Sequence, residues 1–333
     1  FIDVPGHERF VHNMLAGVGG IDILILAIAA DGGVMPQTTE HLHICDLLEI
    51  QNGITVITRC DLADEEMIDL VEEEVFDLIS GTFLEGKPII KTSAATGLGL
   101  EELQKEIAKI SDTLEDSSHS GPFRLPVDRR FTLKGFGTVV TGTVLSGNAG
   151  LNDDLLLYPQ EEKLRIRGFQ VHGEKSDQVA AGQRSAINLT GIQKESIERG
   201  NQIAPPGQLV NTQVLEAELK IIPDVAGLLN NKSKVRLFSN AQEVTGRLYA
   251  GENYDPESSE LQFVQIRLEE TISCRYGDRF ILRTLSPVQT IAGGRVIAPF
   301  GNRTRKNKHR LRESLEGLAS KDETMRVLET VFL

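Results

Sequence analysis

The stretch D-V-P-G-H (residues 3–7) brings a carboxylate, a glycine and an imidazole together directly after an apolar residue that closes a predicted strand. A carboxylate at a strand end can hold a magnesium ion through water. A glycine just beyond it lets a backbone N–H approach a terminal phosphate, and a polar side chain next to that can orient an attacking water. In isolation the motif is weak, because a structural turn has the same composition.

A second group of polar residues, T-R-C-D (58–61), follows the predicted strand 53–58. The carboxyl ends of strands in an open α/β sheet form the crevice in which a base is recognised. Asp61 could accept hydrogen bonds from N1–H and the 2-amino group of guanine, which adenine cannot offer together. Arg59 could lay its guanidinium and stem over the face of the base. The alternative is that Asp61 only caps the helix that begins nearby.

A third group, T-S-A-A-T-G (92–97), also follows a predicted strand. A backbone amide of Ser93-Ala94 could meet the carbonyl of the base there. Three such groups at strand ends, in this order, are improbable by chance. Together they predict a guanine-nucleotide site.

The elements that must position these groups alternate along the first third of the chain. The predicted strands cover residues 22–30, 53–58 and 88–92. Between and after the last two lie amphipathic helical patterns, whose apolar positions are Met67, Val71, Val75 and Leu78, then Leu100, Leu103, Ile107 and Ile110. This alternation predicts a parallel sheet covered by helices.

The rest of the chain shows a different pattern of predicted elements. A polar linker near residues 112–122 is followed by short strands and frequent turns up to about residue 300, which predicts two small closed antiparallel barrels that meet near residue 206. We therefore expect an α/β nucleotide domain over 1–112, a linker over 113–121, barrels over 122–206 and 207–300, and a helical region over 301–333.

Composition limits the class of protein. The chain is 40% hydrophobic and 25% charged, and its longest apolar run is only strand-length. The three cysteines (Cys45, Cys60, Cys274) form neither a disulfide framework nor a C-x-x-C pair, which favours a reduced, cytoplasmic protein without a membrane span. The net charge of -13 argues against general coating of nucleic acid. The basic run 302–312 fits a solvated linker and a nucleic-acid contact equally well.

Two further motifs are set aside. In H-L-H-I-C (41–45), only His41 and Cys45 share a helical face, and two ligands do not make a structural zinc site. G-F-G-T-V-V-T-G resembles a dinucleotide fingerprint only superficially, because no helix follows it.

D-V-P-G-H, T-R-C-D and T-S-A-A resemble the third, fourth and fifth nucleotide motifs of the translational GTPases, a family that also carries two β-barrels after its P-loop GTPase domain. Within that family the chain is similar to the selenocysteine-specific elongation factors over essentially all 333 residues. The stretches that carry the similarity are 31–42, 81–90, 128–143, 171–175, 181–189 and 286–294. Thr58 stands where most of the family has asparagine, a departure that also occurs in the selenocysteine branch.

The resemblance implies roles for the nucleotide motifs. Asp3 would hold Mg²⁺ through water, Pro5 and Gly6 would lie at the phosphates with Gly6 sensing the γ-phosphate, and His7 would position the hydrolytic water once the ribosome licenses it. The residues that would bind the remainder of GTP are Thr58, Arg59, Asp61, Ser93 and Ala94.

The resemblance also implies an aminoacyl pocket formed by Asp128, Arg129 and Arg184. A selenol is far more acidic than a hydroxyl, so it arrives as an anion that arginines can select over neutral serine. The alternative is an ordinary surface salt bridge. The implied partners are selenocysteinyl-tRNA, the ribosome and, through C-terminal modules that we expect beyond this chain, a hairpin in the messenger RNA. We expect a monomer.

Two other functions stay open at this point. The cargo could be that of elongation factor Tu or of the initiator-tRNA-carrying γ subunit, or the barrels could dock RNA without nucleotide turnover. No G-x-x-x-x-G-K-[ST] occurs in the sequence. We therefore expect the phosphate cradle in a segment before Phe1, and we expect these residues alone to bind GTP poorly.

Overall fold

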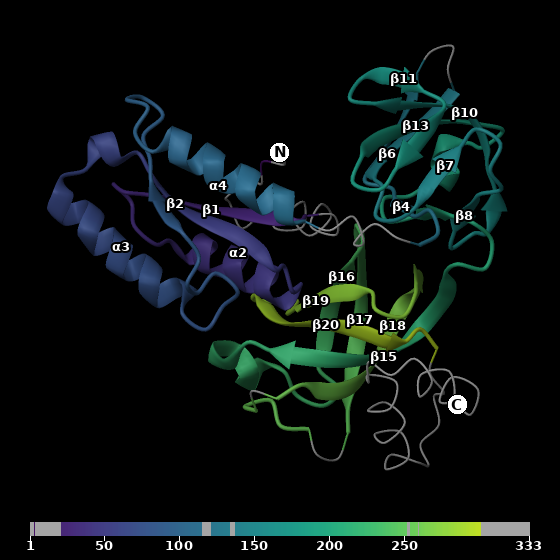
Figure 1. Ribbon diagram of the computed structural model, residues 1–333. Helices are drawn as coiled ribbons and strands as arrows, with labels where there is room; N and C mark the ends of the chain where they lie inside the picture. The colour runs from purple at the N-terminus through teal and green to yellow at the C-terminus, as the bar shows by residue number, and fades with distance from the viewer. Residues whose placement is uncertain are drawn as a thin grey trace. The chain divides into compact units, whose positions relative to one another are not determined.

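The computed structural model describes residue 3 and residues 21–114, 121–133, 137–251, 254–258 and 260–300 (Figure 1). Residues 21–114 belong to one compact unit and residues 121–300 to a second. The expected helical region 301–333, with its basic run, lies outside the described residues.

The first unit is a parallel sheet with helices on both faces, as the alternation predicts (Figure 1). The strand order is β1-β2-β3. The elements are β1 (Ile23–Ala29), α2 (Pro36–Leu47), β2 (Asn52–Thr58), the 3-10 turn η3 (Cys60–Leu62), α3 (Glu65–Ile79), β3 (Ile89–Lys91) and α4 (Leu100–Thr113).

Successive residues of each strand point to opposite faces of this sheet. Leu26, Ile28 and Ile57 pack against α2 and α3, while Ile54 and Val56 pack against α4. The predicted apolar positions of both helices lie in these contacts, apart from the first of each pattern: Met67 is 45% exposed and Leu100 is 41% exposed. Each of these two residues lies in the first turn of its helix.

The first half of the second unit encloses one apolar core with three hydrogen-bonded sheets, rather than with one continuous ring of strands. The sheet orders are β11-β10-β13-β6-β5, β12-β7 and β4-β14-β8-β9. The strands are β4 (Leu125–Pro126), β5 (Arg129–Leu133), β6 (Gly137–Thr143), β7 (Asn148–Gly150), β8 (Leu156–Tyr158), β9 (Glu162–Lys163), β10 (Arg165–Val171), β11 (Glu174–Ser176), β12 (Gln178–Ala180), β13 (Arg184–Thr190) and β14 (Gln202–Ala204), with the 3-10 turn η5 (Lys194–Ser196) before β14.

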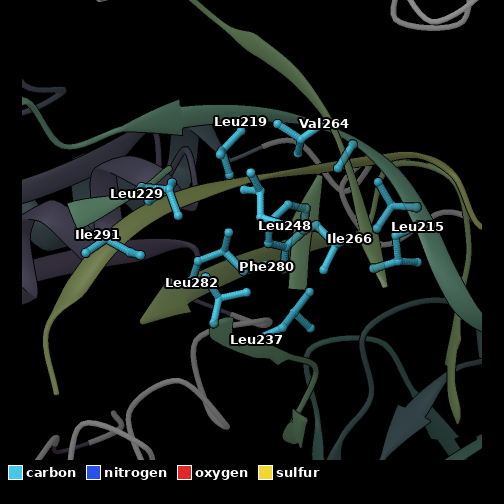
Figure 2. Close-up of a cluster of buried hydrophobic side chains, with 14 of the residues drawn as sticks. Leu215, Leu219, Leu229, Leu237, Leu248, Val264, Ile266, Phe280, Leu282 and Ile291 are labelled. Carbon is cyan, nitrogen blue, oxygen red and sulfur yellow. The ribbon is translucent and has the colours of Figure 1, made fainter. Parts of the chain in front are cut away.

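The second half is a closed antiparallel barrel in the order β15-β18-β17-β16-β19-β20. Its elements are β15 (Val210–Ile221), the 3-10 turn η6 (Pro223–Leu228), β16 (Lys234–Ser239), β17 (Gln242–Ala250), β18 (Gln262–Cys274), β19 (Arg279–Arg283) and β20 (Thr290–Ala298). Inward-facing residues mostly alternate along the strands, as the two-residue period requires, but Ile291 and Ala292 of β20 both lie in the core where the pairing with β19 shifts register. Figure 2 shows Leu237, Leu248, Phe280 and Leu282 meeting in this core, each fully buried.

A buried polar network joins the two halves of the second unit. The Arg124 guanidinium donates to both carboxylate oxygens of Asp278, at 2.5 and 2.7 Å, and the two side chains are 2% and 6% exposed. Arg124 Nε also donates to Gln202 Oε1 at 2.7 Å, and Gln202 Nε2 donates to the Ser273 carbonyl. Arg124 and Gln202 come from the first half and Ser273 and Asp278 from the barrel, so the two halves share one satisfied network.

None of the helices in the described ranges is long and apolar enough to cross a membrane.

Candidate guanine site and aminoacyl pocket

The carboxyl ends of β1, β2 and β3 gather the polar groups that the sequence analysis placed after strands. Ala29 pairs with Thr58 in the parallel register, and Ala30 N donates to the Thr58 carbonyl at 2.8 Å. Cys60 N donates to the Thr92 carbonyl at 3.1 Å, which ties the T-R-C-D turn to the start of T-S-A-A. The segments after all three strands therefore lie at one edge of the sheet.

Asp61 is oriented by a hydroxyl from the neighbouring strand end. Ser93 Oγ donates to Asp61 Oδ1 at 2.6 Å, and Ser93 is fully buried while Asp61 is exposed. Asp61 does not cap α3, because Asp64 does so by accepting from Met67 N at 2.9 Å. The alternative interpretation of Asp61 as a helix cap is therefore wrong.

The turn after β3 holds Ser93 in place. Ser93 N donates to the Leu98 carbonyl at 3.1 Å, Gly97 N donates to the Ser93 carbonyl at 2.9 Å, and Thr96 N donates to Ser93 Oγ at 3.1 Å. Ala94 is exposed on the same turn. The geometry gives one fixed carboxylate beside an exposed backbone segment, which suits a planar ligand with adjacent N–H donors and a carbonyl.

Arg59 takes a left-handed backbone conformation, with φ 60° and ψ 32°. Its side chain is 56% exposed, and Nη2 forms an ion pair with Asp31 Oδ2 at 2.7 Å. The preceding residue, Thr58, points its hydroxyl into the sheet, where Oγ1 donates to the Ile28 carbonyl at 3.3 Å. Thr58 thus links β2 to β1, and Arg59 and Asp61 remain on the solvent side.

The D-V-P-G-H motif is described only at Asp3, which is exposed. Pro5, Gly6 and His7 lie outside the described residues. No cluster of three or more His, Cys, Asp or Glu side chains with metal-binding geometry occurs within the described ranges. A single exposed carboxylate fits Mg²⁺, which keeps several waters and takes few protein ligands when a nucleotide supplies phosphate oxygens.

The predicted aminoacyl residues meet around strand β6. Arg184 Nη1 donates to Asp128 Oδ2 at 2.5 Å, and the hydroxyl of Thr141 donates to the other carboxylate oxygen, Oδ1, at 2.7 Å. Both oxygens of Asp128 therefore have partners. Arg129 is exposed and makes no side-chain hydrogen bond or ion pair with any described residue. It is an exposed cation on the residue that follows Asp128.

Asp31 and Thr141, which contact Arg59 and Asp128, were not predicted from the sequence. Asp31 had a usable signal, because it follows β1 as Asp61 follows β2. Thr141 lies in the middle of a strand, and only the pairing of β6 with β5 and β13 places it beside Asp128.

The family comparisons divide the chain as the fold does. Residues 1–113 match the family model of the elongation factor Tu GTP-binding domain, and residues 137–204 match that of elongation factor Tu domain 2. Residues 217–303 match the β-barrel domain of the selenocysteine-specific elongation factor. The chain is therefore a translational GTPase by class, with a GTP-binding domain followed by the two domains described above.

Comparison with individual proteins indicates which branch of the translational GTPases the chain resembles. The selenocysteine-specific elongation factor of Desulfomicrobium baculatum is 42% identical over 92% of this chain and 48% of its own length. The crystal structure of a bacterial selenocysteine-specific elongation factor matches with a TM-score of 0.85 and 30% identity, over 98% of this chain and 53% of that one. The Methanococcus maripaludis factor SelB in complex with the GTP analogue GPPNHP matches with a TM-score of 0.79 and 26% identity, over 88% and 69%.

The chain belongs to the selenocysteine-specific elongation factors. It spans about half the length of the curated relatives that it matches.

Proposed function

We propose that this chain is the nucleotide-binding and tRNA-carrying part of a factor that delivers selenocysteinyl-tRNA to the ribosome, in the cytoplasm, for selenocysteine incorporation at recoded UGA codons. The observation that carries the specificity is the exposed Arg129 beside the Asp128–Arg184 pair. Asp128 fixes one guanidinium, and Arg129 adds positive charge where a selenolate would bind. The similarity to factors whose names specify selenocysteine favours this cargo over those of elongation factor Tu and the initiation γ subunit.

In the nucleotide domain, Asp61 would read the two donors of guanine, Arg59 would cover the face of the base, and the Ser93-Ala94 backbone would meet its carbonyl. Thr58 would support this edge through its bond to β1. Binding of GTP would favour the state that holds the tRNA, and hydrolysis of GTP would favour the state that releases it.

At the phosphates, Asp3 would hold Mg²⁺ through water, Pro5 and Gly6 would shape the turn that senses the γ-phosphate, and His7 would orient the hydrolytic water on the ribosome. The match of residues 1–113 to the GTP-binding domain supports these assignments. The remaining proposed partner is a messenger-RNA hairpin, bound through modules outside this chain, and the proposed state is a monomer.

The test is competition between selenocysteinyl-tRNA and seryl-tRNA of the same tRNA sequence for the full-length protein with GTP. We expect selenocysteinyl-tRNA to bind more tightly, and Arg129→Ala to reduce that preference about tenfold or more, because hydrogen bonds to a charged group are stronger than those to a neutral one. Arg165→Ala, which removes an exposed arginine elsewhere on the same domain, should leave the preference unchanged. Equal binding of both charged tRNAs would refute the selenocysteine assignment.

A separate titration addresses the third possibility, a barrel pair that docks RNA without nucleotide turnover. If the full-length protein binds GTP and hydrolyses it when ribosomes are added, that possibility is excluded. Tight GTP binding by the 333 residues alone would overturn our expectation that they bind it poorly.

A further inference from the structure

The two side chains proposed to read the base are each held by a partner from an adjacent strand end. Ser93, after β3, fixes Asp61, and Asp31, after β1, fixes Arg59. The first contact lies within the motifs that define the nucleotide site. The second involves an acid that none of those motifs contains.

The backbone around Asp31 is fixed on both sides. Ala30 N donates to the Thr58 carbonyl, while Gly32 N and Gly33 N both donate to the Ala29 carbonyl at 3.0 and 2.9 Å. Val34 N then donates to Glu74 Oε2 of α3 at 3.0 Å. The Asp31 carboxylate, 29% exposed, is thus presented from a closed turn that is registered against β2.

Arg59 needs such a partner more than most surface arginines. Its left-handed backbone sets the direction in which its side chain leaves the turn, but a long, largely exposed side chain retains its rotamer freedom. The ion pair with Asp31, at 2.7 Å between Nη2 and Oδ2, restricts the positions that the guanidinium can take, and a guanidinium held in place can stack on a planar base.

We propose that Asp31 is a positioning residue of the guanine site, which holds the Arg59 guanidinium so that one face is presented to the base. This inference rests on the proposed function. The competing explanation is an ordinary exposed ion pair that has no effect on nucleotide affinity.

The experiment measures the dissociation constants of GDP and of IDP, which lacks the 2-amino group, for the full-length protein with Mg²⁺. Because stacking does not depend on the 2-amino group, Asp31→Asn should weaken both nucleotides by the same factor, about two- to fivefold. In an Arg59→Gln background the same change should have no effect, which a general structural role of Asp31 would not produce. Asp69→Asn, which removes an acidic partner of the exposed Lys91 in the same unit, should leave both constants unchanged. Thermal unfolding without nucleotide shows whether each variant folds.

Asp61→Asn separates this inference from the proposed site itself. If that variant keeps the parent's preference for GDP over IDP, the guanine site is wrongly assigned and the inference falls with it. If Asp61→Asn loses the preference while Asp31→Asn leaves affinity unchanged, increases it, or weakens it equally in the Arg59→Gln background, then only the role of Asp31 is wrong.

Discussion

Arg124→Met should destabilise the second unit strongly. The variant keeps most of the apolar stem but leaves the Asp278 carboxylate, 6% exposed, without its two guanidinium bonds. Among the described residues, Arg275 would then remain as its hydrogen-bond and ion-pair partner, with its backbone N at 3.0 Å and its Nε at 3.9 Å. Breaking a buried pair by removing one partner costs about 3–5 kcal/mol. The loss of the Arg124 donor to Gln202 Oε1 favours the upper end of that range.

In a unit of this size, a loss of that magnitude should lower the unfolding midpoint by about 6–20 °C. The sequence contains no tryptophan, so calorimetry or far-ultraviolet circular dichroism is the suitable assay. Asp278→Leu added to Arg124→Met should recover much of the loss, because it removes the stranded charge.

The matched control is Lys163→Met. Lys163 pairs with Asp154 at 2.7 Å, but the two side chains are 72% and 57% exposed. Its midpoint should move by less than about 2 °C. If Arg124→Met shifts the midpoint no more than Lys163→Met does, the reasoning that burial makes this ion pair indispensable is wrong.

Three further changes test other parts of the structure. Burial raises the pKa of Glu216 from its usual 4.5 to about 7. Between these two pH values the native state binds more protons than the unfolded state, so the free energy of unfolding falls as the pH rises. Glu216→Gln should flatten this fall and add up to about 3 kcal/mol to the free energy of unfolding at pH 8, measured by denaturant titration. Gly294→Ala should cost about 1–3 kcal/mol or more in the same assay because its Cβ would strike a backbone carbonyl of β15, whereas Gly227→Ala, with open space around it, should cost far less. Ser93→Ala should release Asp61 and weaken GDP binding about fivefold or more by equilibrium titration, and unchanged affinity would mean that the hydroxyl does not orient the carboxylate.

The sequence predicts the guanine site better than its supporting contacts. T-R-C-D and T-S-A-A were each expected at the end of a strand in a parallel sheet, and the structure places Asp61 and Ser93 of these two motifs in contact. The choice of Ser93 as the partner depends on the turn after β3, which closes through Leu98 and Gly97. That turn could not be derived from the strand pattern.

The two halves of the second unit differ in how far the pattern of their residues predicts the pairing of their strands. Long strands such as β15 and β18 show a two-residue period, and they form the closed barrel that was expected. In the first half, β4 and β9 have two residues each, too few to show any period, and the division into three sheets was not predicted. Short strands take their pairing from the core that they surround, which no local pattern specifies.

The two candidate sites share one structural feature but leave different groups open to a ligand. In each, a hydroxyl donates to one oxygen of an aspartate: Ser93 to Asp61 at 2.6 Å and Thr141 to Asp128 at 2.7 Å. Asp61 Oδ2 has no hydrogen-bond partner among the described residues, so this carboxylate can still accept from a ligand, as a guanine-reading group must. The second oxygen of Asp128 is taken by an arginine at 2.5 Å, so that carboxylate is fully occupied and recognition falls to the neighbouring cations. We therefore expect the first candidate site to accept hydrogen bonds from a ligand and the second to bind an anion, as the proposed guanine and selenolate ligands would require.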